Sequence, residues 1–273
     1  MTLTCPAKIN LFLSVGQQDG RGYHPIRTAF QAVSLCDTLI VEPSEQDEFT
    51  CNDPSVPKDN TVTKAWRLVL EHVSLPKLAV TLSKAIPSQA GLGGGSSDAA
   101  GMLRAAMKLS RGQLGDREAH EIACAIGADV PFFLTGGLAL AEGYGEALQP
   151  IPDEPRQSIW ILVPPVGVST AVAYRALDSS PRALFEIPPN PFHGPNDFLT
   201  VAPPESAWAV DWLYKNGATF ASLSGSGSAA FGVMPPDAAT QGHAETEELE
   251  GLNGPYKLIK CMTITREQSL WTS

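Results

Sequence analysis

The most constraining feature of this chain is a glycine- and serine-rich segment, AGLGGGSS, at residues 90–97. Before it, apolar residues alternate over 78–82, which predicts a short strand. After it, Ala99, Leu103 and Ala106 recur at helical spacing. A flexible linker would have polar, low-complexity flanks instead. The segment is therefore predicted to be a shaped loop that joins a strand to a helix.

Such a loop is suited to holding an anion. Glycine lets the backbone adopt positive φ, and successive N–H groups can then converge into a nest. The helix that opens near Ser96 adds unpaired amides and the positive end of its dipole. Ser96 and Ser97 could cap that helix, donate to a phosphate oxygen, or bind the Mg²⁺ that accompanies ATP. The loop predicts a cradle for a nucleoside triphosphate, and the alternative is a tight turn before a capped helix.

Two better-known phosphate loops are excluded by spacing. A P-loop requires a lysine directly after its last glycine, and none follows here. The dinucleotide-binding fingerprint requires G-x-G-x-x-G, which Gly91, Gly93 and Gly94 do not match. The acidic residue expected about 20 positions later would be Asp116, which lies in a polar turn.

The composition is that of an ordinary globular enzyme, with 43% apolar and 18% charged residues in 273. This length allows one large domain or two modest ones. The sequence shows neither a membrane span nor a signal peptide. A net charge of −10 argues against nucleic acid or an anionic membrane as a main partner. An anionic substrate would therefore be held by local donors.

The cysteines and histidines indicate neither disulfides nor a resident metal. Five cysteines, with no C-x-x-C pair, are most simply reduced thiols in a cytoplasmic protein. The five histidines are scattered without metal-ligand spacing, so no tightly bound metal is predicted. A serine hydrolase is not supported either, because no G-x-S-x-G elbow is present.

The remaining patterns predict an α+β fold in two halves. Strands are expected over 3–15, 28–42, 137–143, 158–165, 218–223, 229–234 and 257–265. Helices are expected after an Asn60 cap and over 116–127, 169–177, 205–216 and 236–252, the last on the surface. A proline-rich polar stretch near residue 155 predicts domains 1–154 and 155–273.

Two charged residues could carry phosphoryl-transfer chemistry. Lys8 interrupts the first strand, and Asp129 lies between a helix stop and an apolar segment. Taken alone, each is better explained by structure: a lysine on a solvated edge, and an aspartate in a cap or turn. Beside a phosphate cradle, a carboxylate can accept the acceptor hydroxyl's proton, and a lysine can keep that carboxylate ionised. This scheme requires Lys8 and Asp129 to meet.

Aromatic residues offer a site for a base. Tyr23 and His24 place an aromatic face beside an imidazole, and Tyr174 offers a second face. The alternative is that both tyrosines only pack. A second Gly/Ser segment, at 222–233, is either a simple hairpin or part of a phosphate path.

These pieces together resemble one known family. The segments PAKINLFLSV, GYHPIRTAFQAVSLCDTL, DNTVTKA, IPSQAGLGGGSSDAA, GADVPFFLTGGLALAEGYGE, GVSTAVAYRAL, NDF and SGSGSAAFG occur in order from residue 6 to about residue 233. They are similar to the GHMP kinase superfamily (galactokinase, homoserine kinase, mevalonate kinase, phosphomevalonate kinase). Within it they resemble the 4-diphosphocytidyl-2-C-methyl-D-erythritol kinase family, to which the opening segment and GADVPFF are most specific.

The resemblance implies a two-domain α+β fold whose active site lies in the interdomain cleft. It also implies ATP, as Mg-ATP, for phosphorylating the 2-hydroxyl of the methylerythritol unit in the non-mevalonate route to isoprenoids. Lys8 and Asp129 match the family's catalytic pair, with Asp129 as general base. The phosphate loop is matched by Pro87, Ser88, Gln89, Ala90, Gly91, Leu92, Gly93, Gly94, Gly95, Ser96 and Ser97, and adenine by Asn60. The substrate contacts are matched by Asn10, Tyr23, His24, Thr170 and Tyr174, with the two tyrosines sandwiching cytosine and His24 bonding its edge.

The chain departs from the family at one place in this pattern. The family usually has Asp-Gly directly before Tyr-His, whereas here Arg21 precedes Gly22 and the aspartate comes earlier, as Asp19. The loop before Tyr23 is therefore expected to be longer or differently shaped.

Two other functions remain as alternatives. One is a kinase for another small alcohol such as homoserine, against which Tyr23, Tyr174 and His24 argue because homoserine has no base to stack. The other is a nucleotide-binding protein without catalysis, against which the retention of Lys8 and Asp129 argues.

Overall fold

The computed structural model describes residues 1–179, 182–236 and 244–270, and its strands form two sheets. The first sheet has the order β3-β4-β2-β5-β6, with β1 paired to β2. Its strands are β1 (Thr2–Val15), β2 (Ile26–Pro43), β3 (Glu48–Cys51), β4 (Leu78–Ser83), β5 (Leu138–Glu142) and β6 (Ala147–Pro150). The second sheet has the order β10-β11-β7-β9-β8. Its strands are β7 (Ser158–Val163), β8 (Phe220–Leu223), β9 (Ala230–Met234), β10 (Glu245–Gly251) and β11 (Gly254–Met262).

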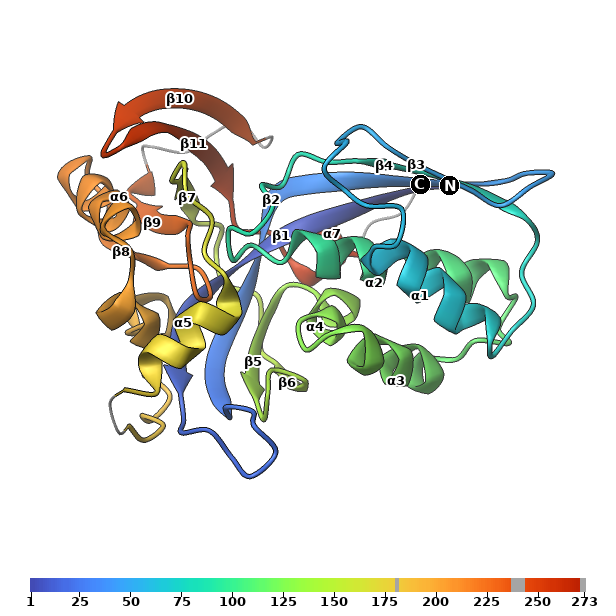
Figure 1. Ribbon diagram of the computed structural model, residues 1–273, viewed down its shortest axis with the longest axis horizontal. Coiled ribbons are helices and arrows are strands. Elements are labelled where there is room, and N and C mark those ends of the chain that lie inside the picture. The colour runs from blue at the N-terminus through green and yellow to red at the C-terminus, as the bar shows by residue number, and fades with distance from the viewer. Residues whose placement is uncertain (180–181, 237–243, 271–273) are drawn as a thin grey trace.

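The long antiparallel pair β1–β2 forms the spine of the molecule (Figure 1). Its register runs from Thr2 opposite Ile40 to Val15 opposite Ile26, with shifts at Pro6/Ala7 and Asn10/Phe12. β1 is buried along nearly its whole length, because it lies beneath helices at one end and against the second half at the other. A charged residue on this strand therefore lies inside the protein and not on a solvated edge.

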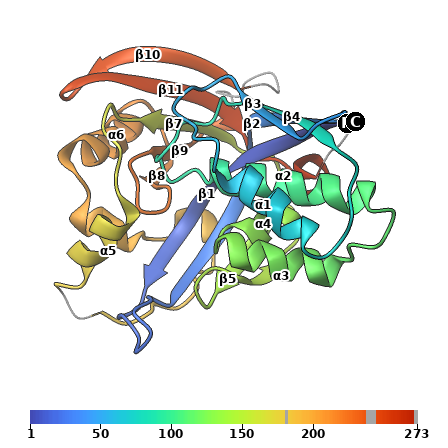
Figure 2. The same ribbon diagram turned by 45° about the vertical axis from the view of Figure 1, so that its right-hand side comes forward.

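Four helices cover one face of the first sheet, as both ribbon views show (Figures 1 and 2). They are α1 (Thr61–Leu70), α2 (Gly94–Leu109), α3 (Asp116–Ile126) and α4 (Val130–Thr135). Their apolar residues, among them Trp66, Leu103 and Phe132, pack with Leu39 and Leu82 of the sheet into one core. Burial of these apolar side chains stabilises the half of the protein that carries the glycine-rich loop.

The second half is covered by α5 (Thr170–Leu177) and α6 (Pro204–Lys215), with short 3₁₀ segments at Pro191–His193 and Asp197–Val201. The two halves interlock. Leu13 of β1 bridges to Asn196, and the short helix α7 (Arg266–Ser269) returns to the first half, where Gly137 N–H donates to Ser269 Oγ at 2.9 Å. The predicted domain boundary at 154/155 lies in the connection between β6 and β7, and it stays a prediction.

The expected helix over 236–252 is wrong where the structure describes it. Residues 237–243 lie outside the described residues, and 245–251 form strand β10, paired antiparallel with β11. The hairpin is closed by Leu252 and Asn253, and Asn253 has φ of 65°. Asn-Gly at 253–254 is a strong hairpin signal, and Lys260 Nζ contacts Glu247 Oε1 across the pair at 2.6 Å. These local signals outweigh the helical periodicity.

Candidate active site

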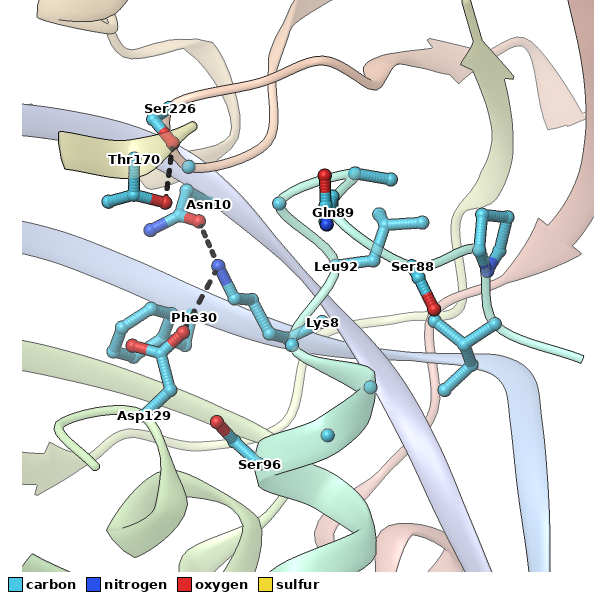
Figure 3. A pocket seen from close by; sticks show the side chains of 18 of the residues that line it. Lys8, Asn10, Phe30, Ser88, Gln89, Leu92, Ser96, Asp129, Thr170 and Ser226 are labelled. Atoms are coloured by element: carbon cyan, nitrogen blue, oxygen red, sulfur yellow. Dashed lines mark hydrogen bonds and ion pairs between the residues drawn. The ribbon is translucent and has the colours of Figure 1, made fainter. Parts of the chain in front are cut away.

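A cavity of about 400 Å³ lies between the two halves of the molecule. The first half lines it with β1, the glycine-rich loop and Asp129, and the second half with α5 and the loop 224–229. Figure 3 shows Lys8, Asn10, Asp129, Thr170 and Ser226 converging on it. The predicted catalytic pair, phosphate loop and part of the predicted substrate set therefore share one cleft.

The glycine-rich loop is clamped against the second Gly/Ser loop. Gly91 has φ of +76°, and a Cβ there would overlap the Ser224 carbonyl oxygen. Ser224 Oγ donates to the Gly91 carbonyl at 2.8 Å, and Ala229 N–H donates to the Ala90 carbonyl at 3.2 Å. On the other side, Lys8 N–H donates to the Leu92 carbonyl at 3.0 Å. Only glycine fits at residue 91, and both halves of the protein hold the loop in place.

The start of α2 leaves its backbone amides available to a ligand. Gly93, with φ of +74°, is the N-cap, and no side chain caps the helix. The prediction that Ser96 or Ser97 caps this helix is therefore wrong, because both lie inside its first turns. Ser96 lines the cavity, whereas Ser97 is fully buried behind it. The uncapped amides at the cavity wall are suited to binding phosphate.

Lys8 and Asp129 meet at the floor of the cavity, with Lys8 Nζ 3.6 Å from Asp129 Oδ2. Lys8 is 3% exposed, and its Nζ also donates to Asn10 Oδ1 at 2.6 Å. Burial lowers the pKa of Lys8, and the charge of Asp129 opposes that shift. Asp129 immediately precedes α4, and its side chain remains 34% exposed. The pair thus combines a fixed ammonium with a carboxylate that a substrate can reach.

Asn10 is held in turn by a short chain of hydrogen bonds. Its Nδ2 donates to Thr28 Oγ1 at 2.9 Å, and Thr28 Oγ1 donates to the Phe12 carbonyl at 2.5 Å. Since Nδ2 donates to Thr28, Oδ1 is the atom left to accept from Lys8. This network fixes the direction of the lysine.

A buried ion cluster behind the loop was not predicted from the sequence. Lys84, at the cavity wall, contacts Asp37 Oδ2, and its Nζ donates to Asp98 Oδ2 at 2.7 Å. Asp37 Oδ1 also accepts from the N–H groups of Ala85 and Ile86 at 2.6 and 2.8 Å. Burial opposes the charge of Lys84, but the two carboxylates outweigh it and raise its pKa. The cluster ties β2, the segment entering the loop, and α2 together.

The residues predicted to hold the base are only partly brought together. Tyr174 lines the cavity, and its ring centroid lies 4.9 Å from that of His24. Thr170 Oγ1 accepts from Ser226 Oγ at 3.3 Å. Tyr23, however, is 62% exposed, and its ring lies against Tyr144 at 5.5 Å. The structure therefore places His24 beside Tyr174 and leaves Tyr23 outside the cavity lining.

Asn60 and the unusual loop before Tyr23 both have structural roles. Asn60 Oδ1 accepts from the N–H groups of Val62 and Thr63, so its side chain caps α1, and the neighbouring Thr61 lines the cavity. In the loop, Asp19 Oδ1 accepts from the N–H groups of Arg21 and Tyr23 at 2.9 and 3.1 Å. Asp19 thus closes the loop before Tyr23. The adenine contact of Asn60 stays a prediction.

Comparison with known proteins matches both halves of the chain. The family model of the GHMP kinases N terminal domain matches residues 60–137, and that of the GHMP kinases C terminal region matches residues 185–245. A 4-diphosphocytidyl-2-C-methyl-D-erythritol kinase of Porphyromonas gingivalis is 37% identical over 84% of this chain and 90% of its own length. One of Solibacter usitatus is 36% identical over 97% of this chain and 90% of its own length. The chain belongs to this kinase family.

A solved structure agrees with this kinase family membership. The crystal structure of a 4-(cytidine 5'-diphospho)-2C-methyl-D-erythritol kinase has a TM-score of 0.74 and 34% identity, covering 85% of this chain and 90% of that one. A mevalonate kinase of Methanococcus jannaschii, with a TM-score of 0.65 and 16% identity, shares the fold alone.

Among the described helices, none has the length and apolar content needed to cross a membrane.

The functional residues that were not predicted differ in whether the sequence carries a signal for them. Lys84 follows the strand predicted over 78–82 and precedes the loop, so a cation near the phosphate path could have been suspected from its position. Asp37 lies within the predicted strand 28–42, and only the three-dimensional pairing of β2 with β4 shows its role. Such long-range contacts leave no local pattern in the sequence.

Proposed function

We propose that this kinase transfers the γ-phosphoryl group of ATP to the 2-hydroxyl of 4-diphosphocytidyl-2-C-methyl-D-erythritol. The observation that carries the proposal is the Lys8–Asp129 pair, 3.6 Å apart on the floor of a cavity whose wall is the glycine-rich loop. Family membership supplies ATP as the co-substrate. The cleft supplies amides for the phosphates and a carboxylate for the acceptor hydroxyl.

In this scheme the residues of the chain have separate tasks. Main-chain amides of the loop and of the start of α2 bind the phosphates. Asp129 accepts the proton of the hydroxyl as its oxygen attacks the γ-phosphorus, and ADP leaves. Lys8, opposite Asp129, offsets the negative charge that spreads over the transferring group. Asn10 holds Lys8 in position through its 2.6 Å hydrogen bond.

Magnesium is proposed to enter with the triphosphate. Among the described residues, no group of three or more His, Cys, Asp or Glu side chains could hold a metal ion. Mg²⁺ usually keeps several waters and needs only one or two protein oxygen ligands beside substrate phosphates, a role open to Ser96 at the cavity wall. Held there, the metal would neutralise part of the negative charge of the phosphates.

The substrate end of the proposal rests on the second half and the 16–25 loop. Tyr174, His24 and Tyr23 are proposed to contact the cytosine, and Asn10 and Thr170 the remainder of the substrate. For Tyr23 this requires its ring to move from its place against Tyr144.

Two further parts of the proposal are a domain boundary at 154/155 and a cytoplasmic location. The five free cysteines favour the cytoplasmic location.

The proposal is tested by ADP release over a panel of acceptors. The wild-type protein is given ATP with the diphosphocytidyl methylerythritol, homoserine, mevalonate or galactose, each in turn. We expect turnover with the cytidyl compound to exceed that with each other acceptor by roughly 10²-fold or more, since those acceptors offer no base to stack. Preference for homoserine would contradict the substrate assignment, and nucleotide binding without turnover on any acceptor would contradict the enzyme assignment.

A further inference from the structure

A second cavity, of about 290 Å³, adjoins the active site at the base end. It is lined by the start of the 16–25 loop, by His24, by the end of α5 with Asp178, and by Arg182. Tyr174 lines the first cavity, and its ring lies 4.9 Å from that of His24 in the second, so the two cavities are neighbours. Asp178 follows Tyr174 by four residues, so both lie on the same face at the end of α5.

His24 is held between two oxygen atoms in this second cavity. Its Nδ1 lies 3.0 Å from the Gly16 carbonyl oxygen, and its Nε2 lies 3.4 Å from Asp178 Oδ1. Both oxygens face ring nitrogens, so the two contacts together set the plane of the imidazole. Asp178 therefore fixes the orientation of His24, while its own side chain is still 39% exposed.

The acceptor character of Asp178 determines which base edge can sit beside it. Cytosine carries an amino group at C4 next to an unprotonated N3, whereas uracil carries a carbonyl at C4 and a protonated N3. A carboxylate accepts from an amino group and repels a carbonyl oxygen. The imidazole of His24 cannot make this distinction alone, because its nitrogens can donate or accept.

We propose that Asp178 is the residue by which this kinase selects cytosine over uracil in its substrate. The carboxylate accepts a hydrogen bond from the 4-amino group of the base stacked near Tyr174, and it holds His24 against the same edge. This inference rests on the proposed function, since it takes the cytidyl end of the substrate to lie beside Tyr174 and His24. Asp178 is a specificity residue in this account and takes no part in the phosphoryl transfer.

The experiment compares the cytidine substrate with its uridine counterpart, for the wild type and for Asp178→Asn. The carboxamide keeps the shape of Asp178 but can donate as well as accept. We expect the wild type to favour the cytidine compound in kcat/KM by roughly 10²-fold, and Asp178→Asn to reduce that ratio at least tenfold. Asp211→Asn, on the exposed face of α6, is the matched control and is expected to keep the wild-type ratio.

A binding measurement separates this inference from the proposed function. CDP and UDP are titrated into the wild type and into Asp178→Asn, with ADP present to occupy the ATP site. Preference for CDP in the wild type, reduced at least tenfold in the variant, supports the inference even without turnover. An unchanged CDP-to-UDP ratio in Asp178→Asn overturns the role of Asp178, while normal wild-type turnover of the cytidine compound would leave the proposed function standing. A wild type that prefers UDP, or that shows no preference, also overturns it.

Discussion

The two ends of the cleft are built in different ways. At the phosphate end, Lys8 and Asp37 are 3% and 0% exposed, and the loop is hydrogen-bonded to both halves of the protein. At the base end, Tyr23 is 62% exposed and is supported by a surface loop. At the phosphate end, burial and hydrogen bonds of the folded protein fix the loop and the side chains. Changes there should therefore affect both the catalytic rate and the stability of the protein. The base end combines the half-buried His24 and Tyr174 with this exposed loop, so changes there should affect substrate affinity.

The largest effect is expected from Asp129→Asn at the phosphate end. An amide cannot take up the hydroxyl proton, so kcat should fall about 10³-fold, close to 4 kcal/mol in the barrier. Because Asp129 does not belong to the loop, ATP should bind with an affinity near that of the wild type. Single-turnover kinetics with a separate ATP titration checks both statements. Turnover within a few-fold of wild type would remove Asp129 as the general base.

The next largest effect is expected in the buried ion cluster, where the two carboxylates can be compared. Asp37→Asn weakens the contact with Lys84 and the acceptor for Ala85 and Ile86, and should lower the free energy of unfolding by about 3 kcal/mol. Asp98→Asn is the matched control. Burial, and then the charge of Asp37, raise the pKa of Asp98 to about 7, so a neutral side chain is tolerated more easily there than at Asp37. Its cost should be below about 1 kcal/mol.

Urea unfolding of both variants measures this difference.

The contribution of the ion cluster to the free energy of unfolding should also depend on pH. Because the pKa of Asp98 is higher in the folded protein than its ordinary value near 3.8, the folded state binds more protons between about pH 4 and 7. The contribution of Asp98 to stability therefore falls as pH rises through that window, and Asp98→Asn should remove this slope. Equal losses for the two variants would contradict the separate roles of the carboxylates.

A smaller effect is expected at the base end, from Tyr174→Ala. The ring packs edge-on against Phe198 at 5.0 Å and lines the cavity, so its loss should weaken binding of the cytidyl substrate by about 2 kcal/mol. KM for that substrate should rise roughly 30-fold while KM for ATP stays the same. Tyr174→Phe retains the ring and serves as the control. If KM for the substrate does not change in Tyr174→Ala, the ring does not hold the base.

The smallest effect is expected from Tyr144→Phe, which tests how firmly the 16–25 loop must be held. The Tyr144 hydroxyl donates to Asp19 Oδ2 at 2.5 Å, and Asp19 closes that loop. Losing this bond should raise KM for the substrate several-fold, about 1 kcal/mol, with kcat unchanged. Steady-state kinetics is sufficient. A fall in kcat without a change in KM would mean that the loop acts on the chemical step instead.

The parts of the fold that the sequence predicted are those with local signals. The strand–loop–helix around AGLGGGSS, the Asn60 cap and the helices now named α3, α5 and α6 are confirmed, because helical periodicity, and at Asn60 a capping side chain, act over a few positions. Residues 245–251 were predicted as helix from weak periodicity, and the cross-strand pairing with β11 decides the structure there. Ser97 looked available for a ligand, but its place within α2 turns it into the core.

The candidate site likewise contains residues that were predicted from the sequence and residues that were not. The resemblance identified Lys8 and Asp129, but their meeting depends on β1 passing beneath the helices, which no local pattern records. Asp37, Lys84 and Asp178 were missed because each acts through a partner distant in the chain. The position of Tyr23 against Tyr144 likewise depends on two loops that are separated by more than a hundred residues.

The most direct test of the central claim follows the γ-phosphoryl group itself. ATP labelled in that group is incubated with the wild-type protein and the cytidyl substrate, and the product is analysed by phosphorus NMR and mass spectrometry. The account predicts one labelled phosphate monoester on the 2-hydroxyl for each ADP formed, with formation slowed about 10³-fold in Asp129→Asn. Label recovered only as inorganic phosphate, or a monoester formed equally fast by the variant, would contradict it.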